Sequence, residues 1–118
     1  METLTKQEQK AVVRQAIAEF IEFLNAAAKK HTEEHFPMLD AETYWVEGGQ
    51  KYIKIACGRS FGQTSVHCFV DALTGDVYKA AGWKAPALNG ARYNLLDEES
   101  LVTLKAKWDP YGGYLYKR

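Results

Sequence analysis

The sequence predicts a single α+β domain, in which a long amphipathic helix packs on a small antiparallel sheet of two hairpins and a short helix follows near the carboxyl end. Three observations predict this class: a helical pattern near the amino terminus, two segments with the pattern of β-hairpins, and a capped helical segment after residue 97. The length of 118 residues fits one domain, residues 1–118, without linker or repeat.

The long helix is predicted to begin after Thr5, because Thr5 and Glu8 have the spacing of a capping box. One face carries Val13, Ile17, Phe20 and Leu24. Further apolar residues widen it, namely Val12, Ala16, Ile21, Phe23 and Ala27. The arc exceeds the roughly 100° that one core requires, so we expect a homo-oligomer, a dimer or larger, in which this helix also contacts a second subunit. Pro37 should end the helix.

Two hairpins should follow the helix. In "TYWVEGGQKYIKIA", residues 43–56, two β-prone runs flank the pair Gly48-Gly49, which suits a tight turn. In "SVHCFVDALTGDVYKAA", residues 65–81, apolar and polar residues alternate before "LTGD" turns the chain back. Asp97 can then cap a short helix that ends at Asp109-Pro110. We expect the tail, "YGGYLYKR", to form a last strand.

The charge balance argues against a long nucleic acid as partner. The chain has 15 Lys and Arg against 15 Asp and Glu, which gives a formal net charge of zero. Binding to long nucleic acids normally rests on a basic surface that displaces counterions. A small anion needs only two or three local cations and is compatible with this composition.

Other features favour a cytoplasmic protein with no membrane segment. No apolar run approaches the roughly 20 residues that span a bilayer. The segment "METLTKQEQK" lacks the apolar core of a secretion signal. Cys57 and Cys68 are too few for a disulfide framework, so we expect two reduced thiols buried in strands.

No pattern predicts catalysis, and we expect neither enzymatic activity nor a cofactor. The chain has no glycine-flanked serine elbow, and neither cysteine has a histidine and an acid at a recognisable spacing. Asp97, Glu98 and Glu99 are adjacent carboxylates, but they stand where a helix start attracts negative charge.

The histidines favour structural roles, and we expect no metal. His31 and His35 are four residues apart and would share a helix face, as two metal ligands do, but no third ligand is evident nearby. His67 alternates with core residues on its predicted strand. This position favours a hydrogen-bonded structural histidine, or a group lining a pocket, over a general base.

The strongest functional signal is the segment "DVYKAAGWKAPALNGARYN", residues 76–94. Trp83 offers a flat face on which a purine can stack. Arg92 carries a planar fork that matches two phosphate oxygens, and Lys84 adds a compact cation. Asn94 has both a donor and an acceptor, which suits an adenine edge or a ribose hydroxyl.

Two further residues shape this segment, and a structural alternative competes with the binding interpretation. Pro86 stiffens the chain, and Gly90 lets the backbone approach a ligand closely. In the alternative, Trp83 fills the core, Pro86 only shapes a loop, and Arg92 pairs with an acid such as Asp97. The chemistry of the residues leaves both interpretations open.

A second, weaker signal is the loop "GRSFGQTS", residues 58–65. It contains glycines but lacks the lysine and hydroxyl pattern of a phosphate-binding P-loop. We therefore expect only that its backbone amides and Arg59 could face an anion.

The run "VHCFVDALTGDVYKAAGWKAPALNGARYN", together with the closing "YGGYLYKR", resembles small phage proteins of the first-described family of Thoeris anti-defence proteins. The resemblance covers residues 66–94 well, the tail fairly, and the amino-terminal helix only in general character. It places the motif's aromatic on Trp83, its polar and basic members on Arg92 and Asn94, and a terminal basic residue on Arg118.

The resemblance implies a sponge in the host bacterial cytoplasm. Such proteins bind the cyclic ADP-ribose isomers made by a bacterial immune TIR enzyme and hold them without degrading them. It also implies dimers or higher oligomers with ligand sites at subunit boundaries, and in some members a separate site for cyclic oligonucleotides. The absence of a catalytic motif agrees with a sponge.

Two alternatives remain open at this point. The first is a protein-directed phage inhibitor of a host anti-phage enzyme, because three Trp and seven Tyr in a small neutral domain also suit an interface. The second is an enzyme that cleaves the same cyclic signal, for which Glu98, Glu99 and His67 would be the candidates.

Overall fold

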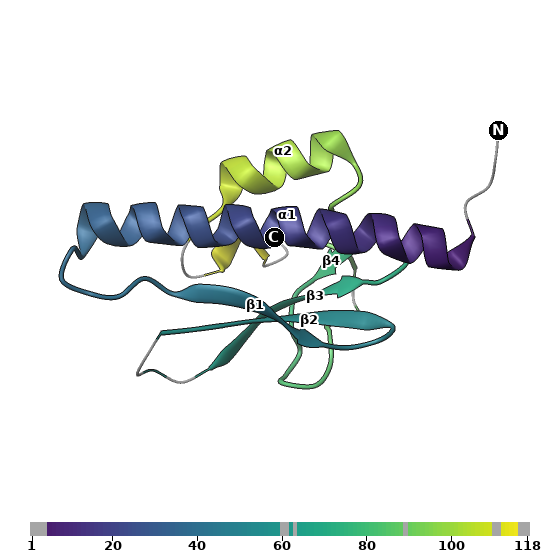
Figure 1. Cartoon of the computed structure of the whole chain (residues 1–118), viewed down its shortest axis with the longest axis horizontal. Coiled ribbons are helices and arrows are strands. Elements are labelled where there is room, and N and C mark those ends of the chain that lie inside the picture. Colours follow the sequence, from purple (N-terminus) through teal and green to yellow (C-terminus); the bar gives the residue numbers. More distant parts are fainter. Residues whose placement is uncertain (1–4, 60–61, 63, 89, 110–111, 116–118) are drawn as a thin grey trace.

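The structure, a computed structural model, describes residues 5–59, 62, 64–88, 90–109 and 112–115. Within them a long helix is followed by an antiparallel sheet, a second helix and a short 3-10 turn (Figure 1). The α+β class predicted from the sequence is confirmed.

Helix α1 (Lys6–His35) begins and ends where the sequence predicts. The Thr5 hydroxyl accepts a hydrogen bond from the Glu8 amide at 3.1 Å, and the Glu8 carboxylate reaches back to the Thr5 amide, which completes the capping box. The last helical residue lies just before Phe36 and Pro37. The buried face comprises Val13, Ile17, Phe20, Leu24, Ala28 and Thr32.

One five-stranded antiparallel sheet packs against α1. Its strands stand in chain order, with each pair antiparallel: β1 (Thr43–Gly48), β2 (Tyr52–Gly58), β3 (Ser65–Asp71), β4 (Asp76–Tyr78) and β5 (Tyr93–Asn94). The turn between β1 and β2 requires glycine, because Gly49 has φ 117° and a Cβ there would lie 2.0 Å from the Tyr52 carbonyl oxygen.

The two faces of the sheet have different roles. Ile53 and Ile55 of β2 are buried in the core shared with α1, together with Val70 and Val77 from the next strands. Because side chains alternate along a strand, Lys54 points to the other face. We call this the outer face. In register across it lie Lys54, Phe69 and Tyr78.

Three predictions about the strands need correction. The return strand of the second hairpin stops at Tyr78, since the chain turns into a loop at Lys79–Ala81. A further strand, β5, lies within the segment that we predicted to be a ligand-binding loop. The tail was predicted to be a strand, but its described part forms a 3-10 turn, η1 (Gly113–Leu115).

The tail turns because of Asp109. Its two carboxylate oxygens accept hydrogen bonds from the Gly113 amide at 3.0 Å and the Tyr114 amide at 2.9 Å. Gly112 has φ 77°, a left-handed conformation that suits glycine. A carboxylate that binds both amides closes the chain into a turn, so these amides do not join a strand.

The short helix α2 (Glu98–Lys107) is capped by Asp97, whose side chain accepts from the Glu99 amide at 3.3 Å. After it, Trp108 meets Phe23 of α1 edge to face, with ring centroids 6.3 Å apart. Part of the wide apolar arc of α1 is thus covered from within the chain. Contact of α1 with a second subunit stays a prediction.

A side chain of α1 covers part of the outer edge of β1. Asn25 donates to the Tyr44 carbonyl at 3.2 Å and accepts from the Tyr44 amide at 2.8 Å. β1 is the first strand of the sheet, so these groups would otherwise be open to another chain. Asn25 therefore closes the edge at that position.

Both cysteines are free and buried, as predicted. Burial raises the pKa of the Cys57 thiol to about 11 and raises that of Cys68 further. The thiols are therefore protonated and poor nucleophiles at neutral pH. No helix in the described part of the chain combines the length and the hydrophobicity needed to cross a membrane.

Candidate functional site

The loop after β4 closes on itself and presents Trp83 near its tip. Ala80 and Pro86 form an isolated antiparallel bridge, and the Ala87 amide donates to the Lys79 carbonyl at 2.7 Å. The amides of Ala81 and Gly82 both donate to the Ala85 carbonyl. We call residues 79–88 the Trp83 loop. Pro86 shapes it, and in Figure 1 it lies on the side of the sheet opposite α1.

Trp83 is not a core residue. Its side chain is 45% exposed, so the alternative in which it fills the interior is wrong. The Lys54 ammonium lies 4.2 Å from the centroid of its ring, which is a cation–π contact. The indole is therefore held over the outer face with much of its surface open to a ligand.

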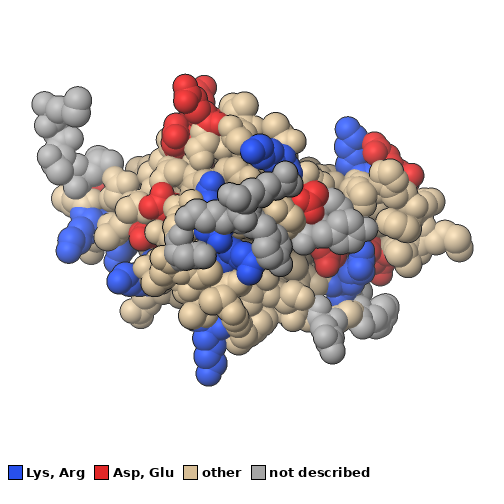
Figure 2. All heavy atoms as spheres, turned by 180° about the vertical axis from the view of Figure 1, so that it is seen from behind, with Lys and Arg blue, Asp and Glu red and all other residues tan. Residues whose placement is uncertain are grey.

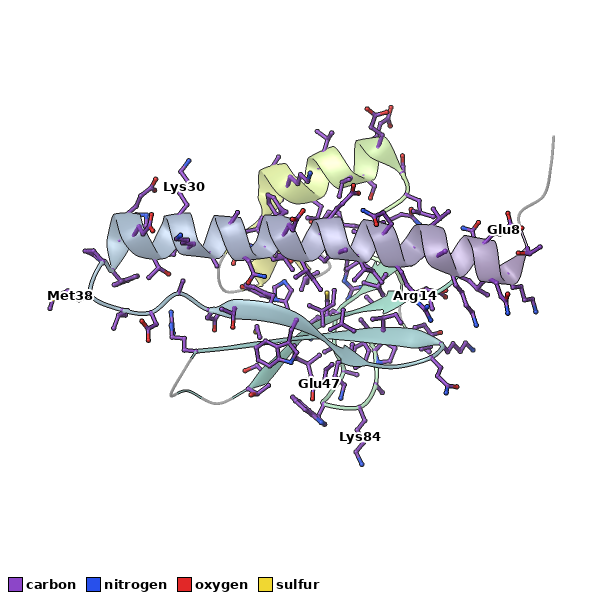
Figure 3. The ribbon with its side chains drawn as sticks, viewed as in Figure 1. Glu8, Arg14, Lys30, Met38, Glu47 and Lys84 are labelled. Carbon is purple, nitrogen blue, oxygen red and sulfur yellow. The ribbon has the colours of Figure 1, made fainter. Side chains whose placement is uncertain are left out.

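A hollow of about 240 Å³ lies on the outer face and shares Lys54 with the Trp83 contact. It is lined by Glu47, Gly48, Gly49, Tyr52, Lys54, Phe69 and Lys84. Lys84, the neighbour of Trp83, is exposed and brings a second ammonium to the rim. Figure 3 shows Glu47 and Lys84 on the side of the sheet away from α1. We call Trp83, Lys54, Lys84 and this hollow the outer-face site.

Arg92 lies elsewhere and already has partners. Its Nε donates to the Leu115 carbonyl at 2.6 Å, and its other guanidinium nitrogen donates to the Gly90 carbonyl. Its backbone amide bonds to the Val77 carbonyl, which continues the sheet. Arg92 thus ties the tail to the sheet edge.

Arg92 lines a larger hollow of about 660 Å³ beside α2. Among the described residues that line this hollow are three acids, Asp97, Glu99 and Asp109, and two cations, Arg92 and Lys107. The Arg92 guanidinium is bonded to two carbonyls. The size of the hollow suits a nucleotide.

The side chain of Asn94 is hydrogen-bonded within the fold. Its amide nitrogen donates to the Thr74 carbonyl at 2.9 Å and to the Asp76 carboxylate at 2.8 Å. Its amide oxygen accepts from the backbone amides of Leu96 and Asp97. The nitrogen end joins β5 to the β3–β4 turn and to β4, and the oxygen end holds the turn between β5 and α2, so we leave Asn94 out of the outer-face site.

Arg59 is a predicted ligand residue that does not line the hollow of the outer-face site. Arg59 donates from Nε to the Asp40 carbonyl at 3.0 Å. Arg118 lies outside the described residues, as do Ser60, Phe61 and Gln63 of the loop that contains Arg59. Of the predicted ligand residues, Lys84 lines the hollow, and Trp83 contacts Lys54, which lines the same hollow.

His67 has the structural role that its position predicted. It is hydrogen-bonded to the Tyr114 hydroxyl, and the ring of Tyr44 meets it edge to face at 4.9 Å. Burial lowers the pKa of His67 to about 4, while the Asp109 carboxylate partly opposes the shift. The imidazole is therefore neutral at physiological pH and fastens η1 to β3.

The rings of His31 and His35 lie next to each other near the end of α1, tilted by 40° with centroids 4.5 Å apart. Among the residues that the structure describes, no three His, Cys, Asp or Glu side chains lie close enough together to hold a metal ion. The pair therefore has no evident third ligand in the described chain.

Lys54 is the site residue that the sequence analysis missed. Alternation along β2 was enough to put it on the face opposite Ile53 and Ile55. The sequence did not indicate which loop would lie over that face, because Lys54 and Trp83 are far apart in the chain.

The surface seen from behind mixes both signs of charge (Figure 2). Lysine and arginine residues alternate there with acidic ones around the tan surface. This view agrees with the zero net charge of the sequence.

The outer-face site and the α+β fold define a small domain with an exposed aromatic and two lysines beside a hollow. The sequence model of a family of unknown function, DUF7717, matches residues 1–117. The chain belongs to that family. No curated protein and no solved structure matches the chain.

Proposed function

We propose that this protein binds a small nucleotide signal and holds it without cleaving it. The ligand class is the cyclic ADP-ribose isomers that the sequence resemblance implies. The observation that carries the proposal is the outer-face site, in which a 45% exposed indole stands beside two lysines and a hollow. The protein would act as a phage sponge in the cytoplasm of the host bacterium.

The chemistry of the site matches the two parts of such a ligand. A base stacked on the indole contributes about 1–3 kcal/mol. The pyrophosphate needs cations close to the stacked base, and Lys54 and Lys84 are both within the site. No catalytic group is required, and none of the outer-face residues has the pairing of a nucleophile with a base.

The hollow is smaller than the ligand, which supports a shared site. At about 240 Å³ it is below the 300–1,000 Å³ typical of pockets that enclose a whole ligand. The rest of the nucleotide would then lie against a second copy of the chain. We therefore include the predicted homo-oligomer in the proposal, and we keep Arg118 as a contact that the second copy or the tail would supply.

The proposal is tested by calorimetry with a purified cyclic ADP-ribose isomer. The wild-type protein should bind it at a fixed stoichiometry, and heating the complex should release the ligand intact. Trp83→Ala should weaken binding about 5- to 150-fold, the equivalent of one lost stacking contact. Lys84→Met should also weaken binding, while Lys107→Met, at the larger hollow, should leave it unchanged.

Three outcomes would contradict the proposal. Absence of binding at micromolar protein would remove the sponge function. Product that accumulates with time would make the protein an enzyme. Loss of binding in Lys107→Met but not in Lys84→Met would move the ligand to the larger hollow. Co-elution with a host enzyme, without ligand binding, would instead support the protein-directed inhibitor.

A further inference from the structure

Lys54 joins the two halves of the outer-face site. It lies in β2 between two buried isoleucines, with Phe69 of β3 as its cross-strand neighbour. Its ammonium is 4.2 Å from the centroid of the Trp83 ring, and the same side chain lines the hollow. One flexible side chain therefore reaches both the place where a base would stack and the place where a phosphate would sit.

We infer that Lys54 is a specificity-determining residue, which covers the indole in the free protein and moves to the phosphate when a nucleotide binds. This inference rests on the proposed function and deepens it. It assigns to Lys54 the selection of phosphorylated nucleotides against neutral nucleosides.

The physical reason is competition for one ring face. An ammonium over an indole is attracted by the ring's negative face, and a stacked base must displace it. A neutral nucleoside has no anionic group to bind the displaced ammonium. The lost cation–π attraction therefore offsets part of the stacking free energy. A phosphorylated ligand offers a charge-assisted hydrogen bond in the adjacent hollow, which restores the lost attraction.

The surrounding charges favour this exchange. Lys84 lines the same hollow and strengthens the attraction for a phosphate. Glu47 also lines it, but its carboxylate accepts a hydrogen bond from the Trp45 indole N–H, which holds it toward β1. The described residues that line the hollow thus include two cations and one anion.

The experiment compares two ligands, a cyclic ADP-ribose isomer and adenosine, by calorimetry on three proteins. Lys54→Met should bind the phosphorylated ligand about tenfold more weakly than wild type, because a charge-assisted hydrogen bond is lost. It should bind adenosine about fivefold more tightly, because the ring is no longer covered. The matched control is Lys51→Met, which removes an ammonium 5.6 Å from the centroid of a different ring, Tyr52. It should change neither affinity by more than about twofold.

A second readout needs no ligand. In protein labelled with 5-fluorotryptophan, the ¹⁹F signal of Trp83 is assigned from its loss in Trp83→Phe. Lys54→Met should shift that signal, and Lys51→Met should not. An unchanged signal would show that the ammonium does not occupy the ring in solution and would overturn the inference.

The binding results separate the inference from the proposed function. If wild type and Lys54→Met bind the cyclic nucleotide equally, the inference fails and the sponge function stands. If Lys54→Met weakens both ligands, the base stacks without displacing Lys54, and the inference also fails. If wild type binds no nucleotide, both proposals fall together.

Discussion

Trp83 and Asn94 come from one stretch of sequence but have opposite environments. Trp83 stands at the tip of its loop with nearly half of its surface exposed. Both ends of the Asn94 amide are hydrogen-bonded, to backbone groups and to the Asp76 carboxylate. Residue type alone does not distinguish these cases, because an Asn that holds a turn and an Asn that binds adenine need the same donor and acceptor.

The candidate site was predictable from the sequence only in part. The sequence left an exposed and a buried Trp83 equally open, and the structure decides for the exposed one, with an exposed Lys84 next to it. Arg92 was assigned to the same cluster because it is near in sequence. Instead, the chain has already returned to the sheet at Arg92. The Arg92 amide donates to the Val77 carbonyl, and the guanidinium donates to the Leu115 carbonyl.

His67 should make stability depend on pH. Its pKa is lowered from 6.5 to about 4 in the folded protein. As the pH falls from about 6.5 to about 4, His67 is protonated in the unfolded chain but stays neutral in the folded protein. The free energy of unfolding therefore decreases. Between pH 7 and pH 5 the histidine alone should remove about 2 kcal/mol, which urea denaturation at both pH values measures.

The control for this experiment is His67→Gln, which keeps a hydrogen-bonding group near the Tyr114 hydroxyl but does not titrate in this range. Its stability should fall less between the two pH values than that of wild type. An equal decrease in both proteins would show that other groups cause the pH dependence.

At the scale of elements, local signals were sufficient where they were strong. The capping box at Thr5 and Glu8 located the start of α1, and Gly48-Gly49 located the first turn. β5 was missed because a strand of two residues has no period to detect. The tail was mistaken for a strand because the effect of Asp109 on its amides depends on where α2 ends.

Asn25 should protect the edge of β1. Asn25→Ala leaves the Tyr44 amide and carbonyl without their side-chain partner. We expect a loss of about 1–2 kcal/mol in the free energy of unfolding, together with association through the open edge. Urea denaturation and size-exclusion chromatography at increasing concentration measure the two effects.

Asn25→Asp is the matched variant, because it keeps the acceptor for the Tyr44 amide but places an anionic oxygen opposite the Tyr44 carbonyl. It should be less stable than wild type at neutral pH, and protonation of the carboxyl at low pH should reduce that difference. If Asn25→Ala is as stable and as free of additional association as wild type, water replaces the side chain fully and the edge needs no such cover.

At the scale of the whole molecule, one core connects the first and the last described elements, α1 and η1. Buried residues run from Val13 in α1 through the sheet to Leu104 in α2 and Leu115 in η1. A helix whose apolar face meets its own sheet in this way gains most of its stability from packing. The fold class was predictable because the apolar residues of α1 recur with the period of a helix. The packing of the tail against the core was not predictable from such a pattern.

The described chain should therefore unfold as one unit. Leu24→Ala and Leu104→Ala remove fully buried side chains from two distant elements, and each should lower the free energy of unfolding by about 2–5 kcal/mol. In each variant the helical circular dichroism and the tryptophan fluorescence should report the same transition. A fluorescence change that precedes the helical one in Leu104→Ala alone would show that α2 unfolds separately.

The Trp83 loop is closed by its own backbone, and a Cβ at Gly82 would meet nothing within 4 Å. A side chain at Gly82 would therefore not press on the scaffold, whereas Trp83 itself contacts Lys54 of β2. The surface beside the exposed ring can thus be varied from this position without repacking the sheet.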